Sequence, residues 1–177
     1  MMKFIFLFVS LIYFSASSCK AAENESHKTR NISETQHYAK DGLSFSYPSN
    51  WRITKDEVYR ELGRFVSVAD AKDGVFMISL FPAEIPLELG ECADEMKSEW
   101  ESKAKDVQTS EIAASVLLEP TKGIRHRFLF ADTAHTQDIF LVRRSKKIAV
   151  LAIQNTDKNW EATNSQFQII LDSLKFD

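Results

Sequence analysis

Lys147–Ile153, with the sequence KIAVLAI, is the stretch around which this chain is organised. Six apolar residues follow the lysine, half of them β-branched, and Gln154 and Asn155 end the run. This is the length of a strand and is short for a helix. Side chains alternate along a strand, so both faces of this one are apolar and both must be covered. The stretch predicts a central strand with other elements packed above and below it.

Shorter segments on either side of this run alternate apolar and polar residues, which is typical of neighbouring strands. They are residues 43–47, 51–54, 63–70, 75–81, 107–118, 123–130 and 137–143. Turn sequences separate them, including Asp41-Gly42 and Asp70–Gly74, and we expect Gly74 to take a positive φ. The pattern predicts a mostly antiparallel sheet.

Helical spacing replaces this alternation at residue 91. Cys92, Met96, Trp100 and Ala104 recur every four residues, with acidic residues between them. An amphipathic helix of about four turns is therefore expected, with this stripe facing the core.

A second helix is predicted after residue 156, where Thr156 or Asp157 is expected to cap its first turn. Its apolar positions are Trp160, Thr163, Phe167, Ile170, Leu171 and Leu174. Two amphipathic helices and a sheet that is apolar on both faces predict an α+β fold. We expect a three-layer α/β/α sandwich with a mostly antiparallel central sheet.

Residues 1–18 form a segment of a different kind. Lys3 precedes the apolar residues 4–14, and small residues 15–18 follow. A basic start, a short apolar run and a small-residue exit indicate a secretory signal peptide. The run is too short to span a membrane, which needs about 20 apolar residues.

Cys19 follows directly, and Ala16-Ser17-Ser18-Cys19 resembles the lipobox of bacterial lipoproteins. Ala16 stands where that motif usually has leucine. The resemblance implies cleavage before Cys19, acylation of its thiol and anchoring of the protein to a membrane of the cell envelope. The alternative is ordinary signal cleavage after Ser18 or Ala21, which would leave a soluble periplasmic or secreted protein.

Residues 19–37 are polar, and such a segment buries too little surface to offset the entropy of ordering it. We expect a disordered tether here and a single domain at 38–177. Residues 1–18 hold one of the 22 basic residues and none of the 25 acidic ones, so the rest has a formal charge of −4. Nothing in this balance favours nucleic acid. Cys92 is expected to be a small buried hydrophobic residue.

The two ends of the predicted domain resemble the PsbP-like superfamily. Residues 38–51, YAKDGLSFSYPSNW, are similar to its opening strand, in which an aromatic-Pro pair is followed closely by Trp. Residues 159–176 are similar to its closing helix and last strand. The resemblance implies an interaction module without a shared set of catalytic residues, so no site residue is carried over. In this interpretation Tyr47, Pro48 and Trp51 are structural.

Two histidines and a carboxylate form a candidate metal site, because His126, Asp132 and His135 flank one predicted turn. Their spacing matches no dedicated metal motif, so the alternative is a core His126 that bonds a backbone carbonyl. No Gly-x-Ser-x-Gly sequence supplies a nucleophile. We expect no catalytic residue, no metal and no cofactor.

The sharpest charged feature is a basic turn before the central strand. Its cations are Arg143, Arg144, Lys146 and Lys147. This is either a solvated turn or a contact site for anionic lipid headgroups or an acidic protein.

The sequence as a whole predicts a non-enzymatic, monomeric envelope lipoprotein. Its domain would bind an envelope protein partner and help assembly. The alternative is a carrier of a small hydrophobic ligand held between the sheet and the helices, for which the 13 phenylalanines provide material.

Overall fold

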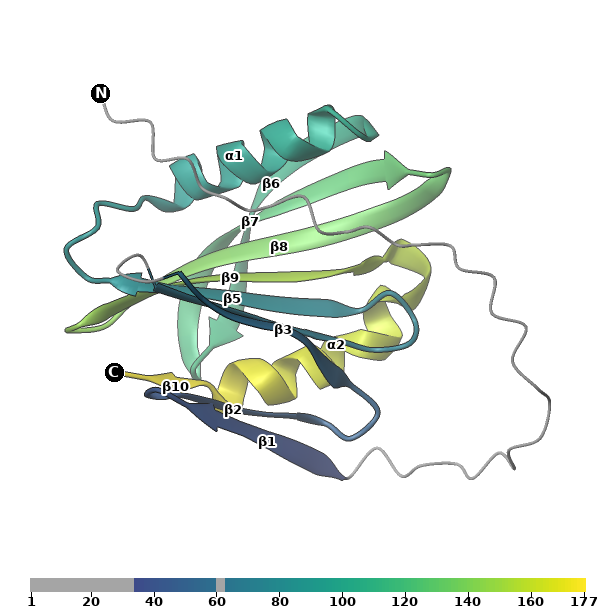
Figure 1. Ribbon diagram of the computed structural model, residues 1–177. Coiled ribbons are helices and arrows are strands. Elements are labelled where there is room, and N and C mark those ends of the chain that lie inside the picture. The colour runs from purple at the N-terminus through teal and green to yellow at the C-terminus, as the bar shows by residue number, and fades with distance from the viewer. Residues whose placement is uncertain (1–33, 60–62) are drawn as a thin grey trace.

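The computed structural model describes residues 34–59 and 63–177. A seven-stranded antiparallel sheet, in the order β3-β4-β5-β9-β8-β7-β6, forms the centre of this part of the chain (Figure 1). The strands are β3 (Arg52–Tyr59), β4 (Gly63–Ala69), β5 (Val75–Pro82), β6 (Lys105–Val116), β7 (Glu119–Phe130), β8 (Thr133–Arg143) and β9 (Lys147–Thr156).

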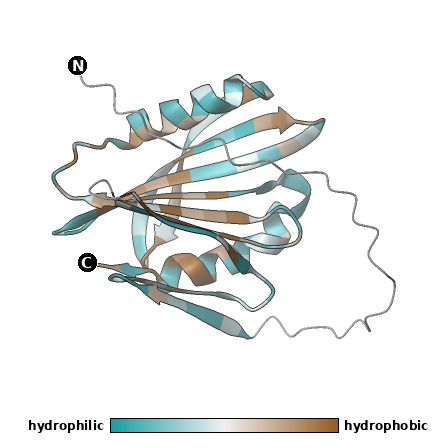
Figure 2. Cartoon of the chain, in the orientation of Figure 1, coloured by the Kyte–Doolittle hydropathy of each residue, from teal (hydrophilic) through white to brown (hydrophobic). Residues whose placement is uncertain are grey.

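Strand β9 is the middle strand of the seven, which confirms the prediction made from residues 147–153. One of its faces presents Ile148, Val150 and Ala152 to a first core cluster. The other face presents Ala149, Leu151 and Ile153 to a second cluster. All six side chains are at most 3% exposed. Both faces of the central strand are therefore covered, and Figure 2 shows the strongly apolar strands running through the middle of the molecule.

Helix α1 (Leu89–Glu101) covers one face of the sheet, mainly over β6, β7 and β8 (Figure 1). Its buried side chains are Cys92, Ala93, Met96 and Trp100. The predicted stripe is thus confirmed except for Ala104. The helix ends at Glu101, and Ala104 lies in the short connection before β6.

Helix α2 (Asp157–Ser173) covers the opposite face and buries Thr163, Phe167, Ile170 and Leu171. The predicted cap is wrong. Thr156 occupies the N-cap position, but its side chain makes no capping hydrogen bond. The carboxylate of Asp157 instead accepts a hydrogen bond from the Thr136 hydroxyl at 2.6 Å, which ties the start of the helix to β8.

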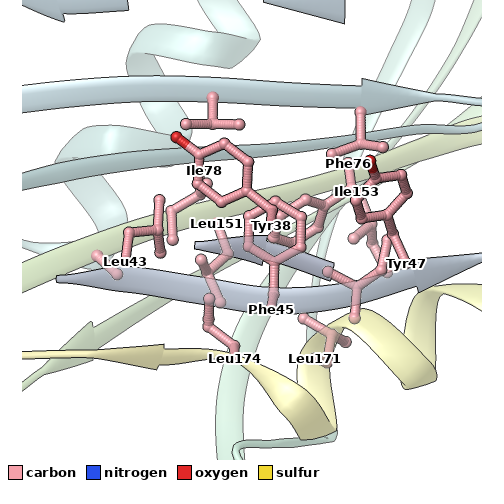
Figure 3. Packing of buried hydrophobic residues seen from close by; sticks show 14 of the residues in the cluster. Tyr38, Leu43, Phe45, Tyr47, Phe76, Ile78, Leu151, Ile153, Leu171 and Leu174 are labelled. Atoms are coloured by element: carbon pink, nitrogen blue, oxygen red, sulfur yellow. The ribbon is translucent and has the colours of Figure 1, made fainter. Parts of the chain in front are cut away.

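A small sheet of β1 (Thr35–Lys40), β2 (Leu43–Pro48) and β10 (Lys175–Phe176) accompanies α2 on this face. Figure 3 shows Phe45 and its neighbours packed between this sheet, α2 and the strands of the large sheet. The ring centroids of Phe45 and Phe76 lie 5.6 Å apart. Strand β1 begins at Thr35, so three residues assigned to the tether belong to the fold. The three-layer α+β prediction holds, with this second sheet added.

The turn at Asp70–Gly74 forms as predicted, but with a different left-handed residue. Asp73 takes a φ of 69°, whereas Gly74 is not among the residues with positive φ. The Asp70 carboxylate accepts hydrogen bonds from the backbone N–H groups of Lys72 (2.7 Å) and Gly74 (2.8 Å). These bonds stabilise the turn locally. In the described residues, no helix is long and apolar enough to cross a bilayer.

Candidate interaction site

The basic turn joins β8 to β9 and is held by backbone hydrogen bonds. The N–H of Arg144 donates to the carbonyl of Lys147 at 2.8 Å. The N–H of Ala83 donates to the carbonyl of Lys146 at 3.1 Å, which ties the turn to the segment after β5. The turn is therefore anchored at two points.

The structure brings the four predicted cations together, but they differ in their surroundings. Arg143 donates a hydrogen bond to the carbonyl of Leu87, close to Glu88 at 3.4 Å, so it is tied to the loop before α1. Lys147 is half-buried. Arg144 and Lys146 are exposed. Arg143 is exposed as well, but it is the one that bonds the fold, whereas the side chains of Arg144 and Lys146 make no hydrogen bond to a described residue.

Arg144 also links the turn to a second feature. Its guanidinium lies 3.6 Å from a carboxylate oxygen of Glu119, the first residue of β7. The neighbouring residue in the β6–β7 hairpin tip is Leu118, whose side chain is 74% exposed. The sequence analysis placed Leu118 inside a strand and did not predict the turn here, because a Leu-Leu pair carries none of the usual turn signals.

The outer face of α1 is acidic, as predicted, but part of its charge is neutralised. Exposed Glu91 and Asp94 project from it. Glu101 pairs with Lys97 at 3.2 Å, and Glu99 pairs with Lys103. Burial, with a contribution from the nearby Glu99 charge, raises the pKa of Glu95. The face therefore carries charges of both signs, and its ion pairs four residues apart stabilise the helix.

His126 is a core histidine bonded to a backbone carbonyl. This was the alternative to a metal ligand in the sequence analysis. Its Nε2 lies 3.0 Å from the carbonyl oxygen of Ala93 on α1, and its Nδ1 lies 3.1 Å from the Thr109 hydroxyl. The carbonyl can only accept, so Nε2–H donates and Nδ1 accepts. Burial lowers the pKa of His126. The side chain thereby links α1 to the sheet.

His135 and Asp132 do not join His126 in a metal site. The His135 ring stacks on Phe128 at 5.5 Å, and Phe128 stacks on Trp100 at 4.1 Å. Asp132 is exposed at the β7–β8 turn. No group of three or more His, Cys, Asp or Glu side chains within residues 34–59 and 63–177 is arranged to hold a metal ion.

Cys92 is a buried free thiol, as expected for a small core residue. Burial, with help from the charges of Glu95 and Glu91, raises the pKa of its thiol to about 11. A thiol of this kind is almost wholly protonated at neutral pH and is a poor nucleophile.

Two ion pairs of low exposure serve the architecture. The Arg64 guanidinium bonds Asp56 at 2.6 and 2.9 Å and also reaches Asp41, joining the small sheet to the large one. Arg125 bonds both carboxylate oxygens of Asp138, at 2.6 and 2.7 Å, beneath α2. These side chains are occupied by structural contacts.

The family follows from comparison with known sequences. A family described as PsbP-like protein matches residues 12–176. The chain belongs to the PsbP-like family. This confirms the resemblance seen at residues 38–51 and 159–176. Trp51, expected to be structural, packs edge-on against Phe167 of α2 at 5.2 Å.

A solved structure shares the fold at low identity, and a second one is similar to this chain. Cyanobacterial PsbP (CyanoP) from Synechocystis sp. PCC 6803 is 17% identical, with 86% of this chain and 98% of that chain covered and a TM-score of 0.54. LpqN of Mycobacterium tuberculosis, described as involved in cell envelope biogenesis, is 14% identical, with coverages of 81% and 90% and a TM-score of 0.49. A search of curated proteins finds no match.

Cys19, the predicted lipidation residue, lies outside the described residues, as do the predicted signal peptide and most of the predicted tether. Their assignment stays a prediction.

Proposed function

We propose that this member of the PsbP-like family is a non-enzymatic, exported protein that is anchored to an envelope membrane through lipidated Cys19. Its domain binds an envelope protein partner through the basic turn at Arg143–Lys147. Members of this family are generally non-catalytic.

The observation that carries the proposal is the exposed, anchored basic turn. Backbone bonds hold the turn in place, and Arg144 and Lys146 project from it. By contrast, Arg64, Arg125 and His126 are occupied by contacts within the fold. Charged groups fixed on a rigid scaffold favour complementary binding to another protein.

Crosslinking in intact cells tests this function. The full chain, tagged between residues 20 and 33, should retrieve one reproducible protein from detergent-solubilised membranes after formaldehyde treatment. An unrelated lipoprotein with the same signal and tether is the control. A clean blank, or the same set of proteins from the control, would contradict the proposal.

The lipid anchor has a separate test. Cys19→Ala removes the acylated thiol, so the protein should move from the membrane fraction to the soluble fraction on cell fractionation. Cys92→Ala, which changes the other cysteine, should leave the distribution unchanged. Persistent membrane association of Cys19→Ala would refute acylation at this residue.

A second function, binding of a small hydrophobic ligand, is favoured by apolar side chains of β4 and β5 that the fold covers only in part. On the α1 side of β4 and β5, Ala69, Val75 and Met77 are only half-buried. Native mass spectrometry of the purified protein would show a bound lipid that Met77→Glu abolishes. A ligand-free spectrum from gently extracted protein would count against this function.

A further inference from the structure

The tip between β6 and β7 holds two leucines in a backbone conformation that leucine disfavours. Leu117 (φ 55°) and Leu118 (φ 61°) both lie in the left-handed region. Two-residue hairpin loops of this type need positive φ at both positions, which is why Asn-Gly is usual there. In an L-residue the Cβ atom then crowds the next carbonyl oxygen. Something must offset this cost.

For Leu117 the fold supplies the compensation. Its side chain is half-buried and packs against the core cluster beneath the sheet. Its N–H donates a hydrogen bond to the carbonyl of Leu171 at 3.1 Å, which joins the hairpin tip to the end of α2.

For Leu118 the domain supplies none. The side chain is 74% exposed, and within the described residues only Val58, at 60%, is another large hydrophobic side chain classed as exposed. Leu118 therefore has a strained backbone and no buried contact that would offset the strain. Such a residue points to a role outside the domain.

Two exposed cations, Arg144 and Lys146, belong to the turn next to this hairpin tip. The Arg144–Glu119 contact places the basic turn beside the tip, and Lys146 of that turn forms no ion pair with any described residue. We define the basic-apolar tip as Leu118, Arg144 and Lys146. Protein interfaces commonly have an apolar centre within a polar rim, and arginine is enriched at their hot spots.

The predicted tether joins the domain far from this tip. Strand β1 begins at one end of the molecule, whereas its other end and the β8–β9 turn lie at the opposite end (Figure 1). The ten residues of β9 alone separate the two ends by about 33 Å. The predicted anchor at Cys19 precedes Thr35 and so joins the domain at the end opposite the tip.

We infer that the basic-apolar tip docks on a protein partner that offers a small apolar pocket for Leu118 within an acidic rim for Arg144 and Lys146. A single exposed leucine offers little apolar surface to insert into a bilayer, so an acidic protein with an apolar pocket is favoured over lipid headgroups. This inference rests on the proposed function and names the contact surface and the chemistry of the partner.

Site-specific crosslinking in cells tests the surface. The full chain carries a benzophenone amino acid at position 118 or, as the matched control, at position 132. Asp132 is also exposed with positive φ (58°), in the hairpin turn at the opposite end of the sheet. Position 118 should give a light-dependent protein adduct, and position 132 should not.

The captured protein, once purified, allows a quantitative test. Leu118→Asn and Arg144→Glu should each weaken binding by about tenfold or more. Asn accepts positive φ, so Leu118→Asn should unfold at the same or a higher temperature, which separates lost binding from misfolding. Replacing an acidic residue beside the crosslinked position of the partner with Arg should restore binding to Arg144→Glu.

Three results would overturn the inference. The first is equal adducts from positions 118 and 132. The second is an adduct to lipid, accompanied by sedimentation with vesicles of equal phosphatidylcholine and phosphatidylglycerol that Leu118→Asn abolishes. The third is a partner that crosslinks only when the benzophenone stands at Asp94 on α1, which would also remove the basic turn as the binding site and leave only the binding of an envelope protein standing. Absence of any partner from formaldehyde capture would instead remove the proposed function.

Discussion

At the scale of single residues, His126 shows how a polar group is accommodated in this core. Its side chain is completely buried and is satisfied by Ala93 on one side and Thr109 on the other. A proton added to Nδ1 would introduce charge into an apolar layer, which is why burial lowers the pKa of this histidine. His135, half-buried nearby, has its pKa lowered by burial as well.

These lowered pKa values predict a pH dependence of stability. Below about pH 6.5 the unfolded chain takes up protons that the folded chain refuses, so the free energy of unfolding should fall as pH falls. It should be independent of these groups above that pH. The slope is at most about 1.4 kcal/mol per pH unit for each histidine. Urea unfolding between pH 8 and pH 5 measures it.

Removing the buried imidazole should reduce that slope. His126→Gln is expected to be less stable at pH 8 but to lose less stability on acidification than the parent chain. His37→Gln, at an exposed position on β1, is the control and should leave the slope unchanged. An unaltered slope in His126→Gln would mean that other groups cause the acid sensitivity.

At the scale of elements, strand β7 depends on a residue without a side chain. A Cβ atom on Gly123 would lie 2.5 Å from Cε1 of Phe140 and 2.9 Å from the carbonyl oxygen of Ile139, both on β8. Such atoms cannot give way easily, because Phe140 is fully buried and Ile139 belongs to the ladder. The close approach of β7 to β8 therefore requires glycine here.

Gly123→Ala should destabilise the protein by about 1–3 kcal/mol through overpacking. Gly90→Ala is the matched control, because a methyl group on Gly90, in the first turn of α1, would meet nothing within 4 Å. That change should be neutral or stabilising by up to about 1 kcal/mol. Thermal or urea unfolding of both variants compares them, and equal stability would show that β8 can move aside.

At the scale of the whole molecule, α2 docks over an ion pair. The Arg125–Asp138 pair lies on the α2 side of the sheet, and the guanidinium carbon sits 5.0 Å from the Trp160 ring centroid. Hydrogen bonding to Asp138 raises the pKa of Arg125. The pair and the indole together fill the space between the sheet and the start of the helix.

Asp138→Ala should cost about 3 kcal/mol of stability, because it leaves the Arg125 charge half-buried without a partner. Lys97→Ala, which breaks an exposed pair with Glu101 on α1, should change stability by no more than about 0.5 kcal/mol. Urea unfolding measures both. A small effect at Asp138 would show that water reaches Arg125 once the carboxylate is removed.

The local spacing of apolar residues was sufficient to predict the layers of the fold. The apolar run at 147–153 identified the middle strand, and the spacing of Cys92, Met96 and Trp100 identified the helix above it. Each pattern reports which face of one element is buried, and that property is written in consecutive residues. The basic turn could also be found this way, since its cations are neighbours in sequence.

Only the tertiary structure decided which distant groups meet. The Ala93 carbonyl that His126 bonds, the Asp138 partner of Arg125 and the position of Leu118 beside Arg144 all depend on register and on how helices dock. Similarly, Asp157 bonds Thr136 instead of capping its own helix. Contacts between elements arise from packing across the whole chain, and no short window of sequence contains both members of such a pair.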